Sequence, residues 1–243
     1  MTLYMIGTGL WDEKDISVKG LEAIKNCSEI YLESYTSKLN CTLETLERFY
    51  GKKINEAGRE FVEGKTEYIL DKAEKSDIAL LVIGDPFCAT THTAIRIRAF
   101  ERNIPVRVIH NASIINSVGI TGLELYKFGK ITSIPFDNKN IRSPYQSYED
   151  NKNSGLHTLF LLDLKPDENR FMTISHAIEY LIRTGLDKYT LCIGCAGVGS
   201  DMPEIKAKSA LELLREEFTL FPQCLIIPGN LHFIEEEALK KLC

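Results

Sequence analysis

The segment Gly84-Asp85-Pro86 directly follows an unbroken apolar run over residues 78–83. An apolar run without alternation is typical of a strand that is buried on both faces of a parallel sheet. In such sheets, ligands bind outside the carboxyl ends of the strands. Gly84 lets a ligand approach the backbone, Pro86 prevents further pairing, and Asp85 places a carboxylate at the strand end. The segment therefore predicts a small-molecule site, and an ordinary turn that contains an aspartate is the alternative.

The side chains near this segment offer no complete catalytic set. Thr90 and Thr91 are expected to cap a helix over residues 94–100. His92 and His110 are expected near strand ends at the edge where the ligand binds. The other histidines are scattered and are expected to be structural: His157, His176 and His232. No nucleophile elbow, Ser-His-Asp order or pair of carboxylates is present, so no catalytic residue and no general base is assigned. This profile favours group transfer from an activated cofactor, in which the enzyme positions the reactants.

A second glycine motif, Gly7-Thr8-Gly9, follows the apolar run at residues 3–6. A dinucleotide-binding fingerprint requires a third glycine three residues later, where helix and strand pack closely. Asp12 occupies that position, so a nicotinamide site is disfavoured, although Glu33 could mimic the acid that binds a ribose. A glycine turn for another adenosine-containing ligand remains open.

Apolar runs and helix-like periodicities alternate along the whole chain. This pattern is typical of an α/β fold with a mainly parallel sheet, in which helices join successive strands. Strands are expected at residues 3–6, 30–32, 78–83, 106–109, 132–135, 158–164, 191–195 and 225–227.

Three helices are also expected between these strands. The apolar spacing over residues 43–50 predicts a helix that ends at Gly51. Thr173 is expected to cap a helix whose apolar face contains residues 174, 178 and 181. A third helix is expected to carry an apolar face of Ala207, Leu211, Leu214 and Phe218.

Small residues and glycines are concentrated between residues 111 and 129, and this stretch predicts a junction between two domains. A chain of 243 residues has room for one large or two small domains. The expected division is an N-terminal α/β domain at residues 1–111 and a C-terminal α/β domain at residues 112–243.

The composition, 44% hydrophobic and 26% charged, is ordinary for a globular protein. The apolar runs are far shorter than the roughly 20 residues that cross a bilayer, and the first residues carry no basic leader. A soluble, cytoplasmic protein that does not bind membranes is therefore expected. The formal net charge of -5, with dispersed lysines and arginines, argues against a nucleic-acid partner.

The cysteines indicate free thiols in a reducing compartment. They are seven, an odd number, and most lie inside apolar segments. The lone motif Cys192-Ile193-Gly194-Cys195 lacks the two further ligands of a zinc site, so no metal is expected. The full set is Cys27, Cys41, Cys88, Cys192, Cys195, Cys224 and Cys243.

Longer motifs extend over essentially the whole chain. They are Leu3-Tyr4-Met5-Ile6-Gly7-Thr8-Gly9-Leu10, Asp15-Ile16-Ser17-Val18-Lys19-Gly20-Leu21, Tyr35-Thr36-Ser37, Gly84-Asp85-Pro86, Thr90-Thr91-His92, Val108-Ile109-His110-Asn111-Ala112-Ser113-Ile114, Leu125-Tyr126-Lys127-Phe128-Gly129, Gly155-Leu156-His157-Thr158 and Pro228-Gly229-Asn230-Leu231-His232. With these motifs, the chain resembles the diphthine synthases, methyltransferases of diphthamide biosynthesis within the tetrapyrrole methylase superfamily.

The resemblance implies two α/β domains of the tetrapyrrole methylase type, with S-adenosylmethionine in a cleft between them and usually a homodimer. Several of the cofactor contacts that it implies would be made by backbone groups, so the identity of those side chains need not be strict. Carried over residue by residue, the contacts fall on Leu10, Asp85, Cys88, Ser113, Ile114, Leu162, Val198 and Gln223.

The resemblance also implies a reaction and a protein partner. The reaction is successive methylation of the amino group of a modified histidine on translation elongation factor 2. Asn111-Ala112-Ser113-Ile114 and Phe49-Tyr50-Gly51 look more like the eukaryotic branch, which implies a further methyl ester on the carboxylate. The order of the amine and ester transfers is open.

Two alternatives to this function stay open at the level of the sequence. One is a methylase of a tetrapyrrole or another small molecule on the same fold. The other is a protein that binds S-adenosylmethionine but has lost turnover, to which Gly197 lends support because relatives usually carry an arginine there.

Overall fold

The computed structural model describes residues 1–64 and 66–242, which form two compact units, Met1–Ile115 and Asn116–Cys243. We call them the first and the second unit. The junction that the sequence predicts, between residues 111 and 112, lies shortly before this division. Cys243, counted above among the cysteines, lies outside the described residues.

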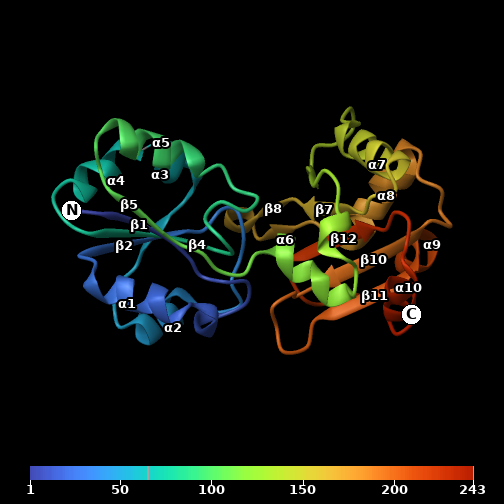
Figure 1. The fold of residues 1–243 in the computed structure, drawn as a ribbon, viewed down its shortest axis with the longest axis horizontal. Coiled ribbons are helices and arrows are strands. Elements are labelled where there is room, and N and C mark those ends of the chain that lie inside the picture. The colour runs from blue at the N-terminus through green and yellow to red at the C-terminus, as the bar shows by residue number, and fades with distance from the viewer. Residues whose placement is uncertain (65, 243) are drawn as a thin grey trace. The chain divides into compact units, whose positions relative to one another are not determined.

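The first unit is a parallel sheet between two layers of helices. Its strands pair in the order β3-β2-β4-β1-β5, and every pairing is parallel. Helices α1 and α2 cover one face, and α3, α4 and α5 cover the other (Figure 1). The bounds are β1 (Leu3–Gly7), α1 (Val18–Asn26), β2 (Glu29–Glu33), α2 (Leu43–Tyr50), β3 (Asn55–Ala57), α3 (Arg59–Gly64), α4 (Thr66–Ala73), β4 (Ile78–Val82), α5 (Thr93–Glu101) and β5 (Val106–Ile109).

Local sequence signals explain most of these elements. Every residue of β4 is buried, as expected for a central strand with helices on both faces. The hydroxyl of Thr42 accepts the amide hydrogen of Thr45, so Thr42 caps the amino end of α2. Gly51 ends α2 with a left-handed φ of 69°, which confirms the predicted helix stop.

The predicted caps of α5 are wrong. The residue that precedes α5 is His92, which makes no capping hydrogen bond with its side chain. The hydroxyl of Thr90 instead donates to the carbonyl of Pro86 at 2.6 Å. Thr90 therefore stabilises the turn after β4, and α5 begins at Thr93, two residues later than a Thr90 cap would require.

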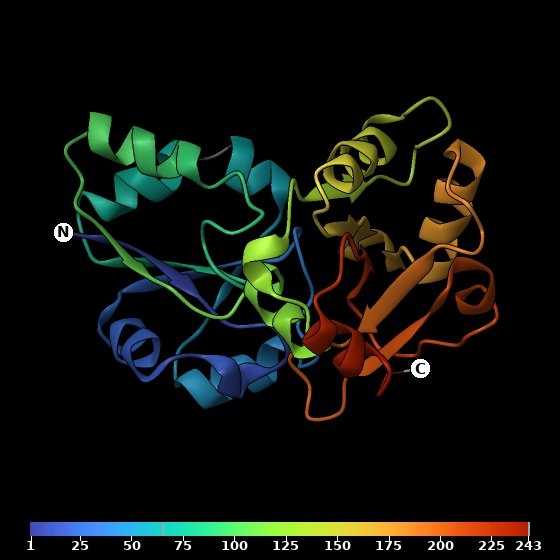
Figure 2. The same ribbon diagram turned by 45° about the vertical axis from the view of Figure 1, so that its right-hand side comes forward.

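The second unit contains a mixed sheet. Its strands pair in the order β11-β10-β12-β7-β6, and Figure 2 shows this unit from a second direction. Only β6 and β7 pair in parallel, whereas the other three pairings are antiparallel. A short hairpin, β8–β9, follows β7. The bounds are β6 (Thr132–Ile134), α7 (Ser143–Asn153), β7 (Thr158–Leu162), β8 (Leu164–Lys165), β9 (Arg170–Phe171), α8 (Ile174–Thr184), β10 (Leu191–Ala196), β11 (Glu204–Ser209), α9 (Ala210–Leu213), β12 (Gln223–Ile227) and α10 (Phe233–Leu239), with α6 (Ile114–Ser117) at the junction.

Two predictions for this half of the chain are corrected. The expectation of a mainly parallel sheet holds for the first unit and is wrong for the second. The expected helix over residues 207–218 is also wrong, because Ala207 belongs to β11 and only Ala210–Leu213 are helical as α9. The Thr173 cap of α8 is confirmed, since its hydroxyl accepts the amide hydrogen of His176.

Glu235 organises the region around α10. Its buried carboxylate accepts hydrogen bonds from the amides of Glu124 and His232, from Lys127, and from Nε2 of His157 at 2.9 Å. Nδ1 of His157 accepts the amide hydrogen of Gly229, so this ring is neutral with its hydrogen on Nε2. His157 is therefore structural, as expected from the sequence.

This network predicts acid sensitivity. Burial by itself raises the pKa of Glu235, but the two amides, Lys127 and His157 outweigh burial and lower this pKa from 4.5 to about 2. A lowered folded-state pKa stabilises the protein above pH 4.5, and this stabilisation is lost as the pH falls toward 2. We expect Glu235→Ala to lower the free energy of unfolding by about 3–5 kcal/mol at pH 7. Denaturant unfolding checks this, and a pH dependence between 5 and 3 that is as steep in the variant as in the wild type would contradict it.

None of the helices in the described part of the chain combines the length and the apolar character of a membrane-spanning segment.

Candidate active site

The loops after β1 and β4 leave neighbouring strands of the first unit toward opposite faces. β1 leads to α1 on one face, and β4 leads to α5 on the other. Such a divergence between adjacent parallel strands leaves a crevice at their carboxyl ends, where ligands of open α/β sheets bind. The candidate site is therefore at this edge, which also receives the loop after β5.

Two glycines join these loops directly. The amide of Gly84 donates to the carbonyl of Gly9 at 2.7 Å, and the amide of Gly9 donates back to Gly84 at 3.3 Å. Both residues have a φ of 83°, a left-handed conformation that glycine adopts without strain. The pair fixes the backbone of both loops at this edge of the sheet.

The surroundings of the two glycines differ. A Cβ atom at Gly9 would lie 2.3 Å from the Cβ atom of Asp15, so that position is filled by the protein itself. A Cβ atom at Gly84 would meet only the carbonyl of Ala112, at 3.9 Å. The space over Gly84 is therefore open, and a ligand can approach the backbone there.

Asp85 follows Gly84 and ties together the loops after β4 and β5. Its side chain is buried, and its carboxylate accepts the amide hydrogens of Phe87 at 2.9 Å and Asn111 at 3.2 Å. Nδ1 of His110 lies 2.8 Å from Oδ2 of the same carboxylate. Burial raises the pKa of Asp85, but the hydrogen bonds from Phe87, His110 and Asn111 outweigh it, and the pKa lies below its usual value. Asp85 is thus ionised at neutral pH.

Two residues outside the predicted cofactor set also shape this edge. The side-chain amide of Asn111 donates to the carbonyls of Gly7 at 3.0 Å and Asp15 at 2.9 Å, which connects the loops after β1 and β5. The carboxylate of Asp15 accepts the amide hydrogens of Leu10 and Trp11. Both residues lie in long motifs of the sequence, Asn111 two residues after the end of β5 and Asp15 shortly before α1.

The predicted cofactor residues of the first unit gather at this edge. Leu10 follows the Gly9 bridge, and its amide is held by Asp15. The amide of Cys88 donates to the carbonyl of Asp85, and Ser113 hydrogen-bonds to the Cys88 thiol. Burial, and after it the Asp85 charge, raises the pKa of Cys88, so this thiol is neutral. Ile114 follows Ser113 and begins α6.

The predicted cofactor residues of the second unit also share one edge of their sheet. Leu162 is the last residue of β7, Gln223 is the first of β12, and Val198 follows β10 by two residues. β12 lies between β10 and β7 and runs antiparallel to both, so its amino end meets their carboxyl ends. All three side chains are buried.

The side chain of Gln223 is already engaged within its own unit. Its Oε1 accepts the amide hydrogen of Ile174 at 2.9 Å, and its Nε2 donates to the carbonyls of Phe218 and Leu220. A ligand contact at Gln223 would therefore be made by the backbone, as the resemblance implies for several of these positions.

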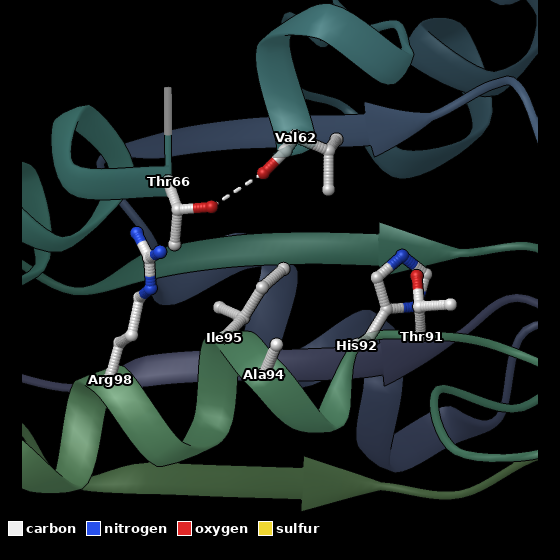
Figure 3. Close-up of a pocket in the computed structure, with 7 residues that line it drawn as sticks. All are labelled: Val62, Thr66, Thr91, His92, Ala94, Ile95 and Arg98. Atoms are coloured by element: carbon white, nitrogen blue, oxygen red, sulfur yellow. Dashed lines mark hydrogen bonds between the residues drawn. The ribbon is translucent and has the colours of Figure 1, made fainter. Parts of the chain in front are cut away.

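A separate cavity of about 230 Å³ lies beside α5 in the first unit (Figure 3). His92 lines this cavity and is 1% exposed, so it does not face solvent at the edge of the sheet as His110 does. None of the eight predicted cofactor residues lines the cavity. Among the described residues, no group of three His, Cys, Asp or Glu side chains could hold a metal ion.

Comparisons with known proteins agree with this architecture. The family model for tetrapyrrole (corrin/porphyrin) methylases matches residues 2–213. A diphthine methyl ester synthase of Dictyostelium discoideum is 44% identical, with 98% of this chain and 96% of that protein covered. The diphthine methyl ester synthase of Homo sapiens is 42% identical, with 98% and 93% covered. A crystal structure of a diphthine synthase superposes with a TM-score of 0.95 at 37% identity and covers 100% of this chain and 96% of that one.

These findings confirm both the fold class and the resemblance that the sequence motifs indicate. The family match extends over both units, and the relatives are aligned along nearly their whole length. The chain therefore belongs to the tetrapyrrole methylase family, in its diphthine synthase branch.

Proposed function

We propose that this protein is an S-adenosylmethionine-dependent methyltransferase that successively methylates a modified histidine of translation elongation factor 2. The observation that carries the proposal is the glycine-bridged edge at Gly9 and Gly84, with open space over Gly84 and an ionised Asp85 beside it. Membership in the diphthine synthase branch supplies the substrate class, because the relatives with full-length similarity carry that name.

The residues at this edge fit the proposed cofactor. Leu10, Cys88, Ser113 and Ile114 lie with Asp85 in or next to the loops after β1, β4 and β5, and they are the proposed cofactor contacts of the first unit. The open face of Gly84 leaves room for close contact with the backbone. In the second unit, Leu162, Val198 and the backbone of Gln223 are the proposed contacts.

S-adenosylmethionine brings its own leaving group, a sulfonium, when it is bound. The protein therefore has to orient the acceptor amine, exclude water from the line of transfer and keep the amine unprotonated. The short loops fixed by Asp85, Asn111 and Asp15 form a rigid frame for that task.

The proposed acceptor is the amino group of the modified histidine, and the eukaryote-like motifs favour a further transfer to its carboxylate. The proposed product thus carries a trimethylammonium group and a methyl ester. We also propose a cytoplasmic homodimer that acts on elongation factor 2, as the resemblance implies. A solution mass of about twice the 27.5 kDa chain would support the dimer.

Transfer of an isotope-labelled methyl group tests the acceptor. The protein is incubated with labelled S-adenosylmethionine and one of three acceptors: elongation factor 2 with the unmethylated precursor, unmodified elongation factor 2, or a tetrapyrrole. Label on the precursor-bearing factor alone is the expected result. Label on the tetrapyrrole would support the small-molecule methylase, and cofactor binding without any transfer would support the inactive binder.

A further inference from the structure

The Asp85–His110 pair could accept a proton, a role that cofactor binding does not require. The Asp85 side chain is 5% exposed, whereas the His110 side chain is 70% exposed. Because an ionised carboxylate only accepts hydrogen bonds, Nδ1 of His110, at 2.8 Å, carries the hydrogen. A histidine ring with its hydrogen on Nδ1 has Nε2 as its acceptor nitrogen, on the side of the ring away from the carboxylate. The protein thus holds a basic nitrogen in fixed orientation at the candidate site.

The following step rests on the proposed function, in which the acceptor is an amine. An α-amino group has a pKa of about 7.7–8.0, so at neutral pH it is mostly a cation without a lone pair. Each methyl addition before the last leaves a substituted ammonium that must lose a proton before it can react again. A carboxylate acceptor has lone pairs at neutral pH and has no proton to lose. Amine methylation therefore needs a proton acceptor, and ester formation does not.

We propose that His110 is the proton acceptor for amine methylation and that Asp85 is its positioning residue. An N–H bond of the substrate ammonium breaks, its electron pair stays on the amine nitrogen, and the proton bonds to Nε2 of His110. The resulting imidazolium is stabilised by the Asp85 carboxylate. Because the ring is exposed, it returns the proton to water before the next transfer.

His110→Asn separates this role from a structural one. The Asn side-chain amide can replace Nδ1 as the donor to Asp85, but it has no basic nitrogen in place of Nε2. The matched control is His176→Asn, which changes an exposed histidine of α8. We expect His110→Asn to slow methylation of the amine by about 10²–10⁴-fold, the usual contribution of a positioned acid or base. Calorimetric affinity for S-adenosylmethionine should stay within a few-fold of the wild type.

Two further measurements distinguish a proton acceptor from a structural residue. Imidazole added to His110→Ala should restore part of the rate of amine methylation, because it replaces the missing base. Elongation factor 2 that carries the trimethylated, unesterified side chain offers only a carboxylate, so His110→Asn should esterify it as fast as the wild type does.

Several results would overturn the assignment. They are a wild-type rate of amine methylation in His110→Asn, an equal loss of amine and ester transfer, and a loss of cofactor affinity that accounts for the slower rate. A wild-type protein that transfers no methyl group to the precursor would instead overturn the proposed function, and the assignment with it.

Discussion

Asp85→Ala is expected to lower the rate of methyl transfer by about 10²-fold or more and to weaken S-adenosylmethionine binding, while the protein stays folded. The carboxylate holds the amides of Phe87 and Asn111 and orients the His110 ring, so the loops after β4 and β5 lose their common anchor. Calorimetry and single-turnover transfer measure the two effects. Circular dichroism and thermal unfolding test the fold.

A matched control for this variant lies at the opposite end of β4. Asp77 immediately precedes β4 and accepts the amide hydrogen of Thr2 at 2.8 Å. Asp77→Ala should cost some stability but leave affinity and transfer close to wild type. If Asp85→Ala binds the cofactor and transfers methyl groups as the wild type does, Asp85 has no part in the site.

Gly84→Ala is expected to weaken cofactor binding by about tenfold or more, which corresponds to about 1.4 kcal/mol. The new methyl group would occupy the open space over Gly84, because the nearest protein atom is 3.9 Å away. The left-handed φ of 83° adds a cost of about 1–2 kcal/mol to folding. Calorimetry and denaturant unfolding separate the two costs.

Gly51→Ala is the matched control for Gly84→Ala. Gly51 ends α2 with a φ of 69°, and a Cβ atom there would meet nothing within 4 Å. Both substitutions should therefore lower stability by similar amounts, but only Gly84→Ala should lose cofactor affinity. Equal affinity in the two variants would contradict a ligand over Gly84.

The first unit could be predicted well because its signals are local and consistent. The strand β4 and the end of α2 at Gly51 each depend on only a few neighbouring residues, an apolar run in one case and a glycine in the other. Asp85 could be placed at the carboxyl end of its strand by the same reasoning. What could not be predicted was its partner, because His110 lies 25 residues further along the chain and reaches Asp85 only through the strand order.

The second unit was harder to predict because strands buried on both faces look alike in parallel and antiparallel sheets. The apolar sequence of β10 does not indicate whether its neighbours run parallel or antiparallel to it. The expected parallel sheet was therefore wrong there. Residues 204–209 alternate in polarity, which is the period of a strand, and Ala207 is the buried member of β11. Reading Ala207 together with Phe218 as one helical face overlooked that alternation.

The buried Glu235 could not be foreseen either. Its acidic side chain lies near the start of a helix, where a carboxylate is usually solvated, yet it bridges Lys127 and His157 from distant parts of the chain. Sequence spacing contains no information on such a contact before the fold is known.

Intact-mass analysis of elongation factor 2 tests the account most directly. The factor with the unmethylated precursor is incubated with this protein and S-adenosylmethionine, and unmodified factor serves as the control. We predict stepwise methyl additions on the precursor only, which end at a trimethylated amine with one further methyl ester. Absence of any addition, despite measurable binding of the cofactor, would contradict the central claim that this protein is a methyltransferase of elongation factor 2.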